Sequence, residues 1–284
     1  MDSRAGRRAF GISNSDRAIG AHLSGKLLRH MGARPHSGPL KYEFIGSAGQ
    51  TFGGFLIKDF NFRLVGEAND YVGKSLSGGT IAITAGEEAS LRGDVLAGNT
   101  VLYGATSGEL YIAGRVGERF AVRNSGALAV VEGVGQHGCE YMTAGIAVIL
   151  GPAGMNLGAG MTGGLAYLLR DSIGGYGYNQ HSVRLAPVEV REELWLRRVL
   201  RKHMRLTDSP RAAKLLDATG PLPFLRVEPL TLPCSVAETW ASILIQLRRP
   251  PVPSLYTPRP VDSETLPLVL KEGELLRSVQ TGLA

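Results

Sequence analysis

Short apolar runs preceded by a glycine recur along the middle of the chain, and their spacing predicts the fold class. Anchored on the glycine before each run, the structural repeat glycines are Gly79, Gly108, Gly126, Gly145 and Gly164. The last four are 18, 19 and 19 residues apart. One short strand per repeat at a near-constant period is typical of a solenoid, whose coils bury their apolar faces against one another. The pattern therefore predicts a mainly β, glycine-repeat solenoid.

Alternation within the runs predicts which side chains face the interior. In the first three runs, apolar residues stand two and four positions after the glycine, and we expect them to point inward: Ile81, Ile83, Leu110, Ile112, Leu128 and Val130. The runs after Gly145 and Gly164 are apolar at every position, so we expect C-terminal helices of the same chain to cover their outer face. The glycines themselves are expected at turns that need a positive φ, Gly126 and Gly145 among them.

The longer step from Gly79 to Gly108 predicts an inserted loop around residues 87–94, and the region after the solenoid reads as helical. A first helix is predicted over residues 190–204, with an apolar stripe at helical spacing formed by Val190, Leu194, Val199 or Leu200, and Met204. Ser209 and Pro210 predict the start of a second helix, which Gly220 ends. A third is predicted from Ser235 past Leu247.

The predicted organisation has four parts. Residues 1–39 form an N-terminal segment, 40–180 the glycine-repeat β-helix, 181–248 the helical extension and 249–284 a proline-rich tail. The prolines of the last part predict an extended chain rather than further packed elements.

Composition narrows the function classes. The net charge is +6 and the pI is about 9.4, but the basic residues gather at the two ends, without interleaved aromatics or a nucleic-acid-binding motif, so we expect no nucleic-acid partner. The chain contains neither a long apolar run nor a signal-peptide core, so we expect no membrane association and a cytoplasmic location. The two cysteines, Cys139 and Cys234, form no metal-binding motif.

Two groups resemble functional sites but lack the context that the chemistry needs. His137, Cys139 and Glu140 combine nucleophile and base types, yet no orienting third group is identifiable, so we expect structural roles. The stretch 158–163 matches G-x-G-x-x-G, but a strand rather than a helix is predicted after it. We therefore expect no catalytic, cofactor-binding or metal-binding residues in this chain. Asn14, Asp16 and Arg17 are candidate interface residues.

Several longer strings resemble the GXGXG domain at the carboxyl end of the glutamate synthase large (alpha) subunit. They include residues 46–50, 68–74, 102–106, 117–126 and 131–142, and the resemblance runs from about Ile12 to about Leu216. It implies a right-handed parallel β-helix with a C-terminal α-helical extension. Here the domain begins at Met1 as a stand-alone chain, which we interpret as a fused polypeptide split into subunits.

The resemblance also implies a function and partners. It implies a non-catalytic subunit of an oxidoreductase complex that converts glutamine, 2-oxoglutarate and reductant to glutamate, in nitrogen and ammonia assimilation. The chain would scaffold a glutamine amidotransferase subunit and an FMN-binding synthase subunit, and FMN and an iron–sulfur cluster would lie on those partners. The alternative is that the chain is the β-helix subunit of another oxidoreductase assembly, such as N-methylglutamate synthase or formylmethanofuran dehydrogenase.

Overall fold

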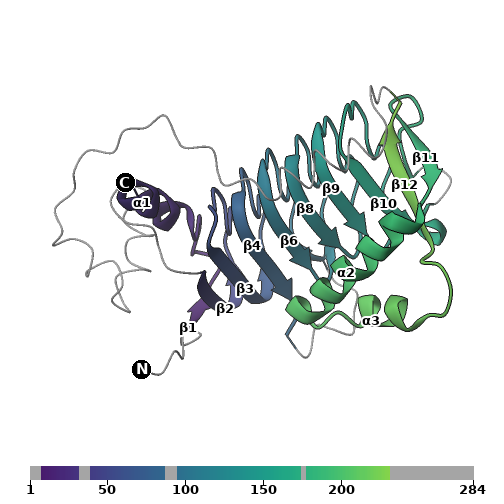
Figure 1. The fold of residues 1–284 in the computed structure, drawn as a ribbon. Helices are drawn as coiled ribbons and strands as arrows, with labels where there is room; N and C mark the ends of the chain where they lie inside the picture. Colours follow the sequence, from purple (N-terminus) through teal and green to yellow (C-terminus); the bar gives the residue numbers. More distant parts are fainter. Residues whose placement is uncertain (1–7, 32–38, 87–94, 174–176, 231–284) are drawn as a thin grey trace.

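The computed structural model describes residues 8–31, 39–86, 95–173 and 177–230, and over them the chain forms a parallel β-solenoid with helices packed on one side (Figure 1). The predicted fold class is therefore confirmed. The predicted loop around residues 87–94, the predicted helix from Ser235, the proline-rich tail and Cys234 lie outside the described residues.

One continuous parallel sheet runs along the solenoid, with one strand from each coil. Its parallel strands, in both spatial and chain order, are β1 (Arg8–Ile12), β2 (Leu40–Ala48), β3 (Phe60–Ala68), β4 (Ser77–Thr84), β6 (Ser107–Ile112), β8 (Ser125–Val131), β9 (Ala144–Ile149) and β10 (Leu165–Leu169). Two short strands, β5 (Val95–Ala97) and β7 (Arg115–Val116), pair on a second side of the coils. β1 shows that the N-terminal segment contributes a strand to the sheet.

The interior of the solenoid is a column of apolar side chains stacked coil on coil. At its N-terminal end, aromatic rings pack edge to face, as in the pair Phe44 and Phe52 with ring centroids 5.3 Å apart. The column continues through Leu64, Ile83 and Ile112, each fully buried. Helix α1 (Ala21–Met31) closes this end, with Leu23 and Leu27 packed against the column. Stacking of this kind is how a solenoid coil buries surface that it cannot bury alone.

The outer face of the sheet changes from polar to apolar along the solenoid. In one row of paired positions, Lys41, Asn61, Thr80 and Glu109 are followed by apolar residues on the last three parallel strands. Those residues are Leu128, Ile146 and Leu165. They form a second buried cluster under α2 (Val190–Thr207) and α3 (Pro210–Asp217). The prediction that helices of the same chain cover this face is confirmed.

Both covering helices begin where the sequence predicts, but α2 continues to Thr207, beyond residue 204, and α3 ends at Asp217, before Gly220. Glu189 and Glu192 form a capping box at the start of α2, and Asp208 takes a left-handed conformation at its end. The Ser209 hydroxyl accepts a hydrogen bond from the amide of Ala212 at 3.0 Å, and Pro210 occupies the first turn of α3. Val190 and Leu194 do not contribute to the apolar stripe, because they are 77% and 58% exposed. Their predicted place in one apolar stripe with Leu200 was wrong, because the buried face of α2 is centred on Leu196 and Leu200.

Two antiparallel strands close the C-terminal end of the sheet, in a region that the sequence predicted as helical only. β12 (Phe224–Pro229) pairs antiparallel with β10, and β11 (Val183–Pro187) pairs antiparallel with β12. They cover the last coil, whose backbone would otherwise present an open edge.

The predicted positive φ is present at all of the repeat glycines except Gly126. The φ values are 72°, 96°, 88° and 79° at Gly79, Gly108, Gly145 and Gly164, whereas Gly126 is absent from the residues with positive φ. The expected left-handed turn at Gly126 is therefore wrong. Ser125 pairs with Ala144 but Leu128 pairs with Ile146, so β8 carries one extra residue at this point. Ala127 thus stands opposite Gly145, and a β-bulge replaces the glycine turn.

The bulge also reverses which side chains of β8 point inward. Because a shift of one residue moves a strand's side chains to the opposite face, Leu128 and Val130 lie under α2 rather than in the interior column. Ala127, Ala129 and Val131 face the interior instead. The inward prediction was correct for Ile81, Ile83, Leu110 and Ile112 and wrong for Leu128 and Val130.

Candidate functional site

A ladder of left-handed backbone arcs runs along the solenoid between successive strands of the main sheet. Each arc has five residues, of which the first, third and fifth have φ between 53° and 77°. The arcs are residues 51–55, 71–75, 100–104, 119–123, 137–141 and 156–160. Several of these left-handed positions carry side chains, including Leu102, Ala121 and Tyr141. Such conformations are rare outside glycine, so the surrounding hydrogen bonds must hold them.

Hydrogen bonds between the arcs supply that constraint. Within the arc 100–104, the amide of Thr100 donates to Glu118 O of the next coil at 2.7 Å. The amide of Leu102 donates to Val72 O of the preceding coil, also at 2.7 Å. The amide of Gly104 then donates forward again, to Val122 O at 3.0 Å. The arcs from 71–75 to 137–141 are bonded alternately in this way to the coils on both sides, and this holds their side chains in fixed directions.

The middle residue of each arc faces the interior, which explains why the side chain of Cys139 is buried. It occupies the same position as Leu102 and Ala121 and is fully buried in the apolar column. Burial without a stabilising partner raises the pKa of the Cys139 thiol to about 12. The thiol therefore stays protonated at neutral pH and behaves as a small apolar side chain.

His137 and Glu140 point to the outer side of the same arc. His137 Nδ1 lies 2.6 Å from Glu140 Oε1, and both side chains are partly exposed. The structure thus separates this pair from Cys139, so the three residues do not converge on one point. No group of three His, Cys, Asp or Glu residues with metal-binding geometry occurs within the described ranges.

The stretch Gly158–Gly163 spans the end of the last arc and the turn that leads to β10. Gly158 and Gly160 have φ values of 77° and 64° as arc residues. The element that follows is the strand β10 and not a helix. The dinucleotide motif requires a helix whose N-terminus faces the pyrophosphate, and this segment does not have one.

The candidate interface residues at the N-terminus are partly built into the fold. The Asp16 carboxylate accepts hydrogen bonds from the amide and hydroxyl of Ser13, at 2.8 and 3.1 Å. Asn14 Oδ1 accepts a hydrogen bond from the side-chain amide of Asn69 at 3.1 Å. Arg17 is exposed. Of the three, Arg17 is therefore the side chain most available to another protein.

The outward-facing residues of the arcs form the surface best suited to contact another protein, here called the ladder face: Phe55, Tyr71, Arg119, Arg123 and Tyr141. Phe55 is 50% exposed and Tyr141 is 59% exposed, although both sit on rigid backbone. The Lys74 ammonium lies 5.2 Å from the centre of the Tyr71 ring. Exposed aromatic and arginine side chains on a rigid support are the composition enriched in protein interfaces.

The ladder face was not predicted from the sequence, because the repeat was traced only through the strands and not through the segments between them. A usable signal was present: the period that aligns the strands also aligns Arg119 with His137 and Arg123 with Tyr141 on successive arcs. Applied to the segments between strands, it would have placed these exposed residues in rows. The sequence does not reveal their left-handed conformation, because few of them are glycine.

A buried ionic network anchors α2 beside the last coil. Arg226 of β12 donates to Glu192 Oε2 at 2.7 Å and to Glu228 Oε2 at 2.8 Å, and all three side chains are buried. Burial lowers the pKa of the Arg226 guanidinium, but Glu192 and Glu228 outweigh that effect and raise it. Arg184 adds a bond to Glu228 Oε1 at 2.7 Å. The network fixes the helix relative to the strands.

A second polar cluster anchors the junction of α2 and α3. Glu132, which follows β8, accepts a hydrogen bond from the Ser209 hydroxyl and lies 3.5 Å from His203 Nε2 and from Arg211 Nε. Burial raises the pKa of the Glu132 carboxyl, but the bonds from His203 and Ser209 outweigh it, so that the pKa is lowered. His203 and Ser209 are buried, so the cluster holds the helices in place.

Comparison with known proteins agrees with this architecture. The GXGXG motif family model matches residues 2–229. Over 212 residues the chain is 47% identical to a ferredoxin-dependent glutamate synthase of Pyropia yezoensis, covering 73% of this chain. It is 49% identical over 214 residues to the corresponding enzyme of Cyanidium caldarium, covering 72% of this chain. It is 44% identical over 213 residues to the large chain of the NADPH glutamate synthase of Bacillus subtilis (strain 168), again covering 72% of this chain.

The matched region is the carboxyl-terminal part of the relatives' large subunits. The chain spans only 14% of the length of each of these three relatives. Within the described ranges, no helix is both long enough and apolar enough to cross a membrane. The family-model match and the identities to these three relatives show that the chain belongs to the GXGXG family and is a glutamate-synthase-like subunit or domain.

Proposed function

We propose that this chain is a scaffold of a glutamate-synthase-like complex and carries none of its catalytic residues. The observation that carries the proposal is the match itself. Nearly all of the described chain corresponds to a region that makes up 14% of the length of relatives named glutamate synthases. The proposal assigns the chemistry of such an enzyme to parts outside the matched region. The relatives described above favour this assembly over N-methylglutamate synthase or formylmethanofuran dehydrogenase.

The proposed partners are a glutamine amidotransferase subunit and an FMN-binding synthase subunit, with FMN and an iron–sulfur cluster on the partners. The ladder face supports a docking role, since it presents aromatic side chains on backbone that is bonded to both neighbouring coils. A rigid surface loses little conformational entropy on binding, and this favours affinity. Arg17 would add contact at the N-terminal end.

The test is reconstitution of the complex with and without this chain. Co-expression with the amidotransferase and FMN subunits should yield a stable assembly with glutamine- and 2-oxoglutarate-dependent glutamate formation. Omission of this chain should abolish the assembly or greatly reduce its activity. Equal activity with and without the chain would refute the scaffold role.

Surface variants locate the docking site. Phe55→Ser together with Tyr141→Ser should weaken co-purification, because each removes an exposed aromatic side chain without touching the interior. Val95→Ser is the matched control, since Val95 is 49% exposed but lies on β5, on another side of the coils. Equal co-purification of the two variants would place the docking surface elsewhere.

A further inference from the structure

The solvent face of α2 carries a line of arginines that the fold does not neutralise. Leu194, Arg198, Arg201 and Arg205 are four, three and four residues apart, so they share one face of the helix. The three arginines are exposed, and none of them makes an ion pair with any residue in the described ranges. By contrast, Arg197 pairs with Glu193 at 2.9 Å and Lys202 pairs with Glu109. We call the side chains of Arg198, Arg201 and Arg205 the arginine line.

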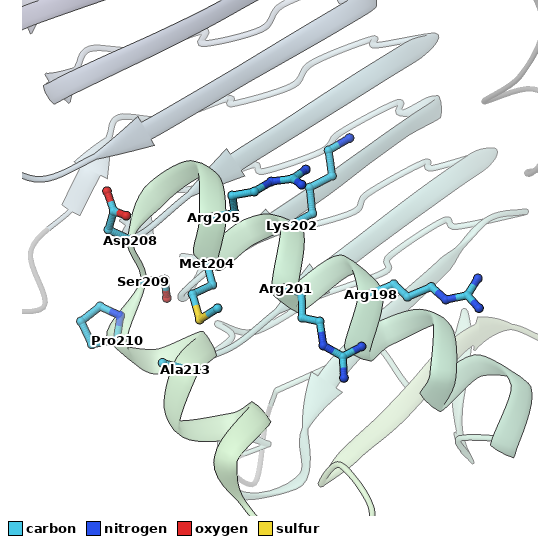
Figure 2. A pocket seen from close by; sticks show the side chains of 9 residues that line it. All are labelled: Arg198, Arg201, Lys202, Met204, Arg205, Asp208, Ser209, Pro210 and Ala213. Carbon is cyan, nitrogen blue, oxygen red and sulfur yellow. The ribbon is translucent and has the colours of Figure 1, made fainter.

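The arginine line borders an open groove of about 1020 Å³ between α2 and α3. Apolar atoms of Met204, Pro210 and Ala213 contribute to its lining. Figure 2 shows the arginines leaving successive turns of α2, with Met204 directed toward the segment that carries Ser209. The groove therefore combines an apolar strip with cations along one side.

Acidic residues do not offset these charges locally. The one carboxylate that lines the groove is Asp208, and it already pairs with Arg63 of β3 at 3.1 Å. Four basic side chains line the same groove: Lys202, which pairs with Glu109, and the three members of the arginine line, which make no ion pair within the described ranges. Several like charges without counter-ions raise the local potential and attract an oppositely charged partner.

We propose that this groove binds an acidic, amphipathic segment of a partner protein. Leu194 to Arg205 spans eleven residue steps, about 17 Å of helix, which is roughly three turns of a partner helix laid alongside. Carboxylates of the segment would pair with the arginine line, and its apolar face would cover Met204 and Leu194. Helix-in-groove binding has this division between apolar anchors and flanking charges.

The groove fits a polypeptide better than other polyanions. Its lining contains no aromatic side chain on which a nucleic-acid base could stack. A bilayer would need apolar side chains that project beyond the cations, whereas Met204, Pro210 and Ala213 lie in a recess between two helices. The surface belongs to α2 and α3 and not to the ladder face, so the proposal stands independently of the scaffold function.

The experiment measures fluorescence anisotropy of a labelled peptide of about 15 residues, with leucines at helical spacing and flanking glutamates, added to the full chain. Binding should saturate and weaken as salt rises. The triple variant Arg198→Glu, Arg201→Glu, Arg205→Glu should bind at least about tenfold more weakly. A version of the peptide with lysine in place of glutamate should not bind.

The matched control reverses three exposed arginines outside both the groove and the ladder face, Arg29, Arg115 and Arg170, and so makes the same change in net charge. Its affinity should change less than about twofold. Equal weakening of the two variants would show a general charge effect and overturn the site. A single-stranded oligonucleotide or phosphatidylserine vesicles that bind more tightly through the same arginines would also overturn the polypeptide assignment. If circular dichroism shows that the glutamate variant is unfolded, Arg→Gln replacements at the same positions test the same loss.

Discussion

The Tyr167 hydroxyl donates a hydrogen bond to Glu192 Oε1 at 2.8 Å, and this contact joins the last parallel strand to the first turn of α2 in a buried site. Glu192 also accepts from Arg226 and from the backbone amide of Glu189. One carboxylate therefore connects β10, β12 and the N-terminus of the helix that covers the sheet.

Removal of that hydroxyl should destabilise the fold measurably. Tyr167→Phe keeps the ring but leaves a buried carboxylate oxygen without one of its donors, which costs about 1 to 3 kcal/mol. Urea unfolding followed by circular dichroism measures the change. Tyr141→Phe is the control, because Tyr141 is 59% exposed and its hydroxyl can bond to water. Equal stability of Tyr167→Phe and the wild type would show that the buried bond contributes nothing net.

Replacement of Gly145 should be costly. Its φ is 88°, and a Cβ would lie 2.6 Å from Ala127 O and 2.8 Å from Asn124 Nδ2. Gly145→Ala therefore combines backbone strain of about 1 to 3 kcal/mol with a clash against the preceding coil. Gly11→Ala is the control, because no atom lies within 4 Å of the Cβ position and φ is not positive. A melting temperature of Gly145→Ala as high as that of the control would contradict this placement.

Burial of Cys139 predicts a loss of stability at alkaline pH. The pKa of its thiol is about 12 in the folded chain, against an ordinary value of 9.0. Between these values the unfolded chain releases a proton that the folded chain keeps, so stability is fully present below pH 9 and falls as pH rises toward 12. The slope approaches about 1.4 kcal/mol per pH unit. Cys139→Ala should remove this pH-dependent component, because alanine has no titrating group. Alanine is compatible with this site, since Ala121 occupies the same position one coil earlier.

The comparison is made by urea unfolding at several pH values above 8. The stability of wild type should fall more steeply than that of Cys139→Ala. Parallel curves would mean that the thiol is not buried as described. Folded chain carrying Cys234→Ser should also resist a thiol reagent that labels Cys139 readily in urea.

The isolated chain is expected to be colourless and to lack glutaminase activity. The cofactors of the proposed complex are assigned to its partners. Visible absorption spectra of anaerobically purified protein check the first expectation, and glutamate release from glutamine checks the second. A flavin or iron–sulfur absorption band would place a cofactor on this chain, and glutamate release would place the amidotransferase chemistry here.

The coarse fold was predictable because the solenoid repeats its own pattern. The interval between Gly108, Gly145 and Gly164 identified the coils, and the two-sided apolar runs of β9 and β10 predicted that helices cover them. The same reasoning failed at Gly126, where the bulge in β8 shifts the pattern by one residue. A period read from glycines cannot detect an insertion of one residue that leaves the next anchor in place.

The candidate surfaces were less predictable, for two physical reasons. The ladder face depends on left-handed residues such as Arg123 and Tyr141, which are held by hydrogen bonds between coils and not by their own preference. The arginine line depends on which arginines of α2 find acidic partners, and Glu109, a partner of Lys202, comes from a distant strand. Sequence alone does not specify such long-range pairings.

The regular stacking of coils fixes distances along the solenoid. From β1 to β10 the parallel sheet has eight strands and therefore seven steps of about 4.8 Å, roughly 34 Å in total. Two proteins attached at its ends would be held at a separation counted in coils. Removal of one whole coil would move them closer by one step of about 4.8 Å, with a small rotation from the twist of the sheet. Such a change tests whether the distance between attached proteins matters to their joint activity.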